Sequence, residues 1–253
     1  MKLLRDTWIV YVRYVQILVG NPAWIVIGVV QPLLYLMLFA PLLKSIAAMP
    51  GFPPGGAYNV FVPGLLIQLG LFGAAGVGFS LIAELRNGVI ERMRVTPVSR
   101  LALLLGRGLR DVMTLVIQGL ILTLLAIPFG LDLHPLGLVI ALGLVALIGL
   151  AISSIAYTLA LWLRSEDSYA PLIFTASLPI LLLSGVLLPL SLAPGWLQRI
   201  GEANPLSYAV TAARAAFLEQ MSDPSIVKAL VIMGVLAIVF VAMAARSFSR
   251  AVA

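Results

Sequence analysis

Six stretches of this chain are long and apolar enough to cross a lipid bilayer, and they leave little room for another kind of fold. A bilayer core about 30 Å thick needs about 20 apolar residues of helix. The chain has 253 residues, of which 62% are hydrophobic and 10% charged, whereas about a quarter of soluble-protein residues are charged. The expected spans are about 23–43, 60–83, 101–129, 136–163, 169–188 and 226–245. We therefore predict an all-α polytopic membrane protein that forms one transmembrane domain over residues 1–253.

Residues 1–20 have the pattern of a helix that lies in the membrane interface. One helical face is apolar, made of Leu4, Trp8, Val12, Val15 and Val19, while Lys2, Arg5 and Arg13 lie elsewhere. A signal peptide is the alternative, but Arg13 interrupts the apolar stretch and no small-residue cleavage site follows. Between the last two spans, Pro and Gly break residues 190–220 into two expected external helices, and Asn204-Pro205 has the cap pattern that starts the second.

A charged segment separates the second and third spans. Residues 84–100 hold six of the 26 charged side chains, counting 16 basic and 10 acidic residues. An Arg at the bilayer centre costs roughly 2.5–3.5 kcal/mol, so this segment lies outside the hydrocarbon. Gly88 can break the helix that leaves span two, and Pro97 disfavours a helical conformation at Thr96. We therefore expect a short helix over about residues 88–95.

The short helix has charged side chains suited to a partner surface. Glu91 and Arg94 lie at i, i+3 on one face, and Arg92 is available to a carboxylate of a partner. The plain alternative is a basic loop that only fixes topology. Twelve Lys and Arg residues fall on the side of the two termini and this segment, and four on the other side. The positive-inside rule then places the termini and the segment in the cytoplasm. We expect a multi-pass protein of the plasma membrane, and the family resemblance described below implies a bacterial inner membrane.

The sequence argues against chemistry performed by the chain itself. It has no cysteine, and no ionisable side chain lies near the centre of an expected span. The lysines are Lys2, Lys44 and Lys228, and none follows a glycine as a phosphate-binding loop requires. His134 is expected to be a solvated loop side chain. We therefore expect no enzyme activity, no metal and no cofactor on this chain, and the net charge of +6 does not indicate a nucleic-acid partner.

Small and amide side chains occur inside the second and third spans. Gly70, Ala74 and Gly78 recur at i, i+4 and i+8, which lets another helix approach closely. Packing within the chain is favoured over a dimer contact, and both stay open. Gln68 and Gln118 suit hydrogen bonds between helices or a mildly polar pathway.

Two sequence runs resemble a known family. The run ELRNGVIERMRVTPVSRLALLLGR, from Glu84 to Arg107, resembles the cytoplasmic segment between spans two and three of type-2 ABC exporter permeases, in the branch with daunorubicin-resistance-type and nodulation-factor-type permeases. The run NPLSYAVTAAR, from Asn204 to Arg214, is similar to a motif before the last span of that family. The resemblance implies that Glu84, Arg86, Gly88, Glu91, Arg92, Arg94, Thr96 and Pro97 belong to a coupling helix that docks on an ATPase. The resemblance also implies that the external helix carries a family motif, with Asn204, Pro205, Tyr208 and Arg214 as its characteristic residues.

The resemblance also implies partners and a substrate class. Such a permease pairs with a second permease copy or a paralogue and with two ATP-binding subunits, which hold ATP and Mg. It would export a hydrophobic or amphiphilic molecule such as a drug, a polyketide or a lipid. A permease for a polysaccharide or glycolipid, an ion-coupled drug carrier and a structural subunit are the alternatives. The second motif is open between a capped interfacial helix and a gate or lid.

Overall fold

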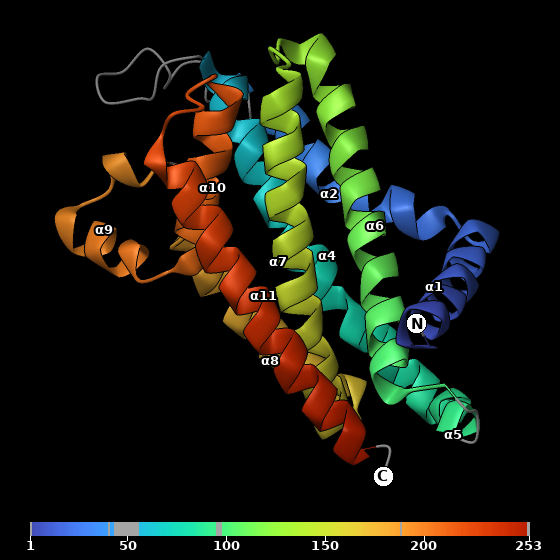
Figure 1. Ribbon diagram of the computed structural model, residues 1–253. Helices are drawn as coiled ribbons and strands as arrows, with labels where there is room; N and C mark the ends of the chain where they lie inside the picture. The colour runs from blue at the N-terminus through green and yellow to red at the C-terminus, as the bar shows by residue number, and fades with distance from the viewer. Residues whose placement is uncertain (1, 40, 43–55, 95–97, 188, 252–253) are drawn as a thin grey trace.

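A computed structural model of the chain describes residues 2–39, 41–42, 56–94, 98–187 and 189–251, and all regular structure in these ranges is helical (Figure 1). The elements are α1 (Lys2–Gly20), α2 (Ala23–Leu38), α4 (Gly56–Arg86), α5 (Val89–Arg94), α6 (Arg100–Ala126), η1 (Ile127–Phe129), α7 (Pro135–Leu163), α8 (Glu166–Leu182), η2 (Leu190–Leu192), α9 (Gly195–Glu202), α10 (Pro205–Phe217) and α11 (Pro224–Ala251). The predicted all-α fold class is confirmed for the described part of the chain.

Four of the described helices are long and apolar enough to cross a membrane, namely α4, α6 with η1, α7 and α11. A fifth crossing results if α1 and α2, which meet at 73°, form one broken span. These helices confirm a polytopic membrane protein. The helices α2 and α8 have only 16 and 17 residues, or about 24–26 Å at 1.5 Å per residue. The count of six spans therefore stays a prediction.

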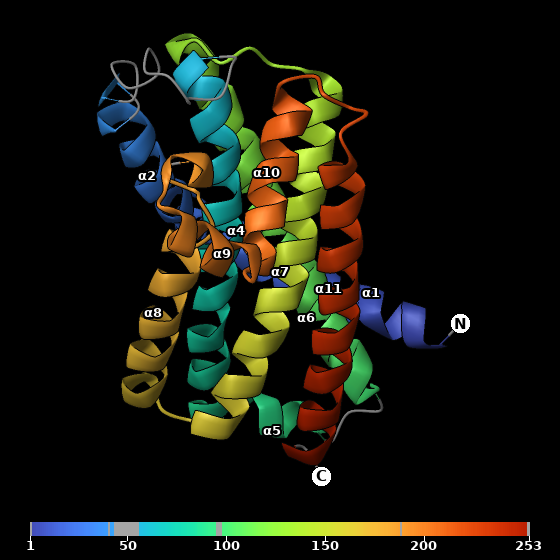
Figure 2. The ribbon, with the colours of Figure 1, turned by 90° about the vertical axis from the view of Figure 1, so that its left-hand side faces the viewer.

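The bundle has two distinct ends (Figures 1 and 2). One end, called the α5 end below, carries α5, the α7–α8 connection and the carboxyl terminus, and the opposite end carries the α6–α7 and α10–α11 connections. The helix α8 occupies the half near the α5 end, and α10 occupies the other half, with α9 at the side of the bundle (Figure 2). Two half-length helices thus share the depth that one long helix covers elsewhere.

The helix α10 lies deeper in the bundle than the sequence suggested. We expected a short external helix, partly dipped into the membrane interface, within residues 190–220, and the structure packs it against α4, α7 and α11. Its alanines Ala209, Ala212, Ala213 and Ala216 are completely buried. Because these side chains are small, they let the neighbouring helices approach closely, which accounts for the burial of so short a helix.

The buried core divides into two hydrophobic clusters. The larger cluster joins α4, α6, α7, α10 and α11. The smaller one lies at the α5 end and includes Ile90 and Met93 of α5, Leu104 of α6, Tyr157 of α7 and Phe248 of α11. The short helix α5 is therefore packed onto the bundle through its apolar side chains rather than held only by its two ends.

The small residues of α4 pack within the same chain. A Cβ atom added to Gly70 would lie 3.3 Å from Ile148 of α7, and one added to Gly78 would overlap the ring of Tyr169 of α8. Ala74, between the two glycines, is completely buried. The stripe of small residues therefore receives α7 and α8, as the packing interpretation requires.

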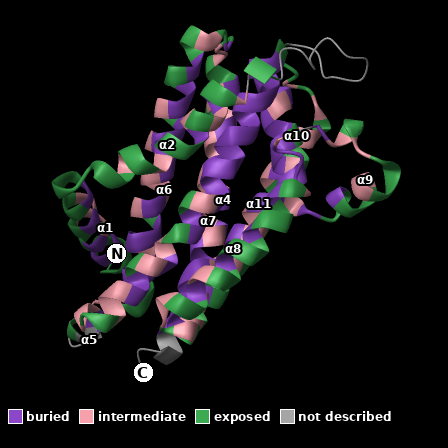
Figure 3. Cartoon of the chain, turned by 180° about the vertical axis from the view of Figure 1, so that it is seen from behind, coloured by how far each residue is buried: buried purple, intermediate pink, exposed green. Residues whose placement is uncertain are grey.

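The helix α1 has two differently occupied sides. The residues that pack on α6 are Val10, Tyr14 and Leu18, together with Asp6 and Thr7. The apolar face expected in the membrane interface is mostly uncovered, with Leu4 at 76%, Trp8 at 64% and Val19 at 71% exposure. Figure 3 shows this exposed side of α1 at the flank of the bundle. A helix with one side on protein and another free for lipid fits an interfacial position.

Gln68 of the second expected span and Gln118 of the third are both buried. Gln68 Oε1 has no hydrogen-bond partner among the described residues. Gln118 donates to the carbonyls of Trp24 and Ile25 at 3.2 Å each. These carbonyls belong to the first turn of α2, so Gln118 fastens the bend between α1 and α2 to α6. A Cβ atom at Gly28 would overlap the Gln118 amide, and the glycine leaves the space that this contact needs.

A substitution at Gly28 tests this fastening. Gly28→Ala is expected to destabilise the protein by about 1–3 kcal/mol, because an extra methyl group in a filled space forces its neighbours apart. Gln118→Ala added to it should recover part of the loss. The matched control is Gly234→Ala in α11, where a Cβ meets nothing within 4 Å and helix propensity improves. The midpoint of thermal unfolding in detergent is measured for the unaltered protein, Gly28→Ala, Gly28→Ala with Gln118→Ala, and Gly234→Ala. Equal midpoints for Gly28→Ala and Gly234→Ala would contradict the placement of Gln118.

Candidate functional site

The helix α5 is set off from α4 by a tight turn. The helix α4 ends at Arg86, and Gly88 has φ +65°, a left-handed conformation that glycine adopts without strain. Arg92 folds back on this turn, with Nη2 donating to the Asn87 carbonyl at 3.1 Å. On the far side, Ser99 Oγ accepts from the Ala102 amide at 3.1 Å and caps α6. The sequence therefore builds a separate six-residue helix at about the place expected for residues 88–95.

The face of α5 that could meet a partner is only partly described. Ile90 and Met93 are buried against the bundle, at 4% and 6% exposure, and Arg92 is exposed. The side chains of Glu91 and Arg94 and the residues Thr96 and Pro97 lie outside the described part of the chain. Their docking role stays a prediction.

A buried ion pair stands directly behind α5. Arg107 of α6 donates from Nη2 to Oε1 of Glu84, near the end of α4, at 2.7 Å, and the two side chains are 3% and 21% exposed. The second oxygen of Glu84 accepts from the Tyr14 hydroxyl of α1 at 3.0 Å. Burial raises the pKa of Tyr14 to about 12, so this hydroxyl keeps its proton and stays a donor at neutral pH.

The same guanidinium connects to a second carboxylate on α6. Arg107 lies over the rings of Tyr14 and Tyr157, at 5.0 and 5.2 Å from their centroids, in cation–π geometry. The Tyr157 hydroxyl of α7 donates to Asp111, whose other oxygen lies 2.9 Å from Arg110 Nη1. We call Tyr14, Glu84, Arg107, Arg110, Asp111 and Tyr157 the polar network. It joins α1, α4, α6 and α7 at one level of the bundle.

A more exposed ion pair joins α4 to α8. Arg86 Nη2 lies 2.9 Å from Glu166 Oε1, with the side chains 70% and 41% exposed. Two of the predicted docking residues, Glu84 and Arg86, are thus bonded within the chain. Such an exposed pair contributes about 0–1 kcal/mol, so the polar network is the stronger link between α5 and the other helices.

Sequence reasoning found only part of the polar network. Arg110 and Asp111 are neighbours in the sequence, so a local ion pair between them can be read from it, and that pair is present. Sequence reasoning missed the contact between Glu84 and Arg107, which are 23 positions apart. It also missed the hydrogen bond from the Tyr14 hydroxyl to Glu84. The available hint was the position of Arg107 inside an expected span, because a buried guanidinium needs a carboxylate nearby.

The second motif fixes the start and the depth of α10. Asn204 caps the helix by accepting from the Leu206 amide at 3.0 Å, and its Nδ2 donates to the Ile180 carbonyl at 2.6 Å. Pro205 is the first helical residue, as the cap pattern predicts. Arg214 lies near the other end of the helix. Asn204 thus ties α10 to the end of α8.

Arg214 is held by backbone rather than by a carboxylate. Its Nε donates to the Val60 carbonyl of α4 at 2.8 Å, and its Nη2 donates to the carbonyls of Gly185 at 2.8 Å and Val186 at 3.2 Å. Tyr208, one turn after the cap, faces outward, donates to the Glu202 carbonyl at 2.8 Å and stacks with Lys228. In this motif Asn204 therefore caps the helix, Arg214 anchors it to neighbouring backbone, and Tyr208 lies at the surface.

Side chains of the types that bind metals do not cluster in the described part of the chain. Among the described residues, no group of three or more His, Asp or Glu side chains is placed to hold a metal ion. His134 Nδ1 lies 2.5 Å from Glu219 Oε1, so this histidine contacts a carboxylate in the loop before α11.

The described helices form a membrane domain with the short helix α5 packed at one end. The profile of the ABC-2 type transporter family matches residues 5–218, and the chain belongs to that family. It is 27% identical over 209 residues to a protein named as a transport permease, ycf38, of Cyanophora paradoxa, covering 82% of this chain and 72% of the relative.

Two further relatives cover most of the chain. The ycf38 permease of Porphyra purpurea is 30% identical over 200 residues, covering 77% of this chain and 67% of its own length. The daunorubicin resistance ABC transporter permease protein DrrB1 of Streptomyces coeruleorubidus is 27% identical over 203 residues, covering 76% and 68%. The expected resemblance to type-2 ABC permeases, including drug-resistance permeases, is confirmed.

Proposed function

We propose that this chain is the membrane-spanning subunit of an ATP-driven exporter and that a separate ATP-binding subunit drives it through α5. The observation that carries the proposal is the construction of α5. It is a separate helix at one end of the bundle, anchored by Ile90 and Met93, with Arg92 exposed on the outside. To transmit a movement, a coupling helix needs an exposed face that a partner can contact and a buried face that is packed on the bundle. The helix α5 has an exposed residue, Arg92, and two buried ones, Ile90 and Met93.

The polar network would carry the movement of α5 into the bundle. Glu84 lies five positions before the first residue of α5 and bonds to α6 and α1, so a displaced α5 displaces Glu84. Arg107 and Tyr157 extend the contact to α7. A packed group of this kind, joined by hydrogen bonds and cation–π contacts, would move as a unit between two arrangements rather than bend gradually. Closure of the ATP-bound partner would then select one arrangement of the bundle.

The proposed transporter has a defined orientation in the membrane and contains several subunits. The α5 end and both termini face the cytoplasm of a bacterial inner membrane, because twelve of the 16 basic residues lie on that side. Two ATP-binding subunits, which hold ATP and Mg, and a second permease copy or paralogue complete the transporter. Membrane lipid covers the apolar face of α1, since Leu4 and Trp8 are exposed.

Charge reversal on α5 tests the docking. Glu91→Arg with Arg94→Glu is expected to abolish substrate-stimulated ATP hydrolysis by the purified complex, because like charges then face each other across the interface. Membrane insertion should be unchanged. The control is Arg199→Glu on the exposed surface of α9. Normal transport by the double variant, or ATP hydrolysis by this chain alone, would refute the proposal.

The substrate we propose is hydrophobic or amphiphilic, such as a drug, a polyketide or a lipid. The aliphatic composition of the spans supports this class, as does the name of the Streptomyces relative, which refers to daunorubicin resistance. Stimulation of ATP hydrolysis across a panel of antibiotics and lipids would identify the class. Stimulation only by oligosaccharides would replace it with the polysaccharide alternative.

A further inference from the structure

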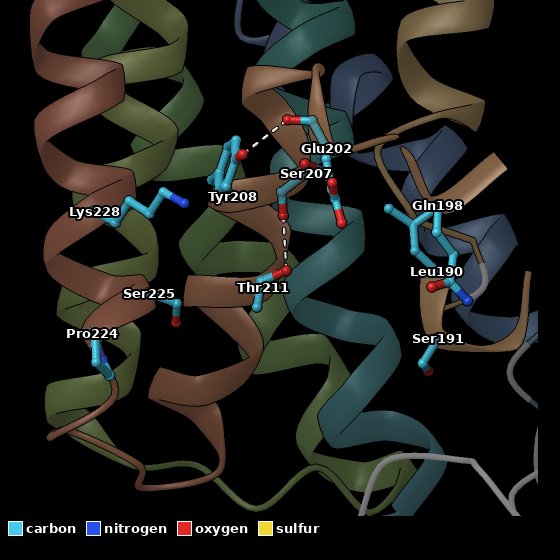
Figure 4. A pocket seen from close by; sticks show the side chains of 10 residues that line it. All are labelled: Leu190, Ser191, Gln198, Glu202, Ser207, Tyr208, Thr211, Pro224, Ser225 and Lys228. Atoms are coloured by element: carbon cyan, nitrogen blue, oxygen red, sulfur yellow. Dashed lines mark hydrogen bonds between the residues drawn. The ribbon is translucent and has the colours of Figure 1, made fainter. Parts of the chain in front are cut away.

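A pocket of about 390 Å³ lies between η2, α9, α10 and the start of α11 (Figure 4). It is lined by Leu190, Ser191, Gln198, Glu202, Ser207, Tyr208, Thr211, Pro224, Ser225 and Lys228. Eight of these ten side chains carry a hydroxyl, an amide or a charge, although 62% of the whole chain is hydrophobic. The volume is within the range of about 300–1,000 Å³ that is usual for small-molecule sites.

The pocket offers an anion site on α11. The Lys228 ammonium lies 4.3 Å from the centroid of the Tyr208 ring and makes no ion pair with a described carboxylate. Ser225, at i, i+3 from Lys228 on the same helix face, has a buried Oγ without a hydrogen-bond partner among the described residues. Asp223 already caps the start of α11 by accepting from the Ser225 amide at 2.8 Å. An incoming anion would therefore be held by Lys228 and the Ser225 hydroxyl rather than by the helix end.

The pocket offers a cation site on α9. Glu202 is exposed, and its carboxylate makes no ion pair within the described part of the chain. Tyr208 contacts both residues, because its ring lies against the Lys228 ammonium and its hydroxyl donates to the backbone carbonyl of Glu202 (Figure 4). Both charges remain available to a ligand.

We propose that this pocket binds a zwitterionic headgroup that carries a phosphate and a primary amine. Lys228 and the Ser225 hydroxyl hold the phosphate, and Glu202 accepts hydrogen bonds from the ammonium group. A purely anionic ligand would be repelled by the Glu202 carboxylate and would leave that charge unpaired. A purely cationic ligand would be repelled by the Lys228 ammonium in the same way. The transport proposal does not require this site, so each can fail without the other.

Binding of short-chain lipids tests the headgroup. Purified full-length protein in detergent is titrated with dihexanoyl phosphatidylethanolamine or dihexanoyl phosphatidylglycerol, and native mass spectrometry measures the bound fraction. The unaltered protein should prefer the ethanolamine lipid. Lys228→Gln should weaken both lipids about tenfold, the scale of one charge-assisted hydrogen bond. Glu202→Gln should weaken only the ethanolamine lipid.

Arg199→Gln is the matched control, because it removes an exposed cation from α9 that does not line the pocket. It should bind both lipids like the unaltered protein. Competition by free phosphoethanolamine would identify a soluble zwitterion as a sufficient ligand, and its failure to compete would identify the acylated lipid. Equal binding of the two lipids by all variants, or binding of neither, would overturn the proposal.

Discussion

Replacing Glu84 by leucine is expected to lower the free energy of unfolding by about 3–5 kcal/mol, the usual cost of removing one partner of a buried ion pair. The loss is large because the Arg107 side chain is only 3% exposed. Water cannot reach the guanidinium to replace the carboxylate. Tyr14 also loses its acceptor, at 3.0 Å from the other oxygen of Glu84. Equilibrium unfolding of the purified protein in detergent measures the effect.

A second variant separates stability from coupling. Glu84→Leu with Arg107→Leu removes both charges, and apolar replacement of a whole buried pair is often neutral, so most of the lost stability should return. Stimulated ATP hydrolysis by the assembled complex should stay low, since α4 and α6 are no longer linked behind α5. Full recovery of both properties would show that the polar network is only structural.

The control for these variants is the exposed pair of the same region. Arg86→Leu breaks the contact with Glu166, whose side chain is 41% exposed, and should cost no more than about 1 kcal/mol because solvent screens such a pair. If Arg86→Leu is as harmful as Glu84→Leu, then burial does not explain the importance of the polar network. The comparison therefore tests the physical reason as well as the residue.

Local sequence patterns predicted the features that depend on neighbouring residues. Gly88 ends α4, Asn204 and Pro205 start α10, and α5 falls within the expected range, because caps and breaks are decided within one helical turn. The apolar side of α1 could also be read from its periodicity. Hydropathy likewise gave the long spans, since crossing a bilayer is a matter of length and apolar content.

Features that depend on distant parts of the chain were not predictable in this way. Nothing in the sequence aligns Glu84 with Arg107 or brings Tyr157 to Asp111, because those contacts follow from how α4, α6 and α7 pack. Hydropathy also does not show how deeply a short helix is buried among its neighbours. For this reason α10 was expected to be an external helix and not a packed part of the bundle. The spacing of Ala209, Ala212, Ala213 and Ala216 was the one hint of close packing, since small residues at i, i+3, i+4 and i+7 form a single face.

The burial of α10 makes Arg214 the second position where we expect a large effect. Arg214→Met should lower the free energy of unfolding by about 3–6 kcal/mol, because two donor nitrogens, Nε and Nη2, lose their carbonyl acceptors at about 1.5–3 kcal/mol each. These bonds fasten α10 to α4 and to the segment after α8. The methionine keeps most of the apolar packing, so the loss reports chiefly on the hydrogen bonds.

Arg214→Lys and Arg199→Met distinguish the anchor from charge alone. The lysine keeps the positive charge but cannot reach carbonyls on two sides as a planar guanidinium does, so its loss should be intermediate. Arg199 is exposed on α9, and its replacement should change stability by no more than about 0.5 kcal/mol. Hydrogen exchange at residues 185–187 should rise in Arg214→Met and stay normal in Arg199→Met, because only Arg214 donates to that backbone. Full stability in Arg214→Lys would mean that the charge, and not the two-sided geometry, holds α10 in place.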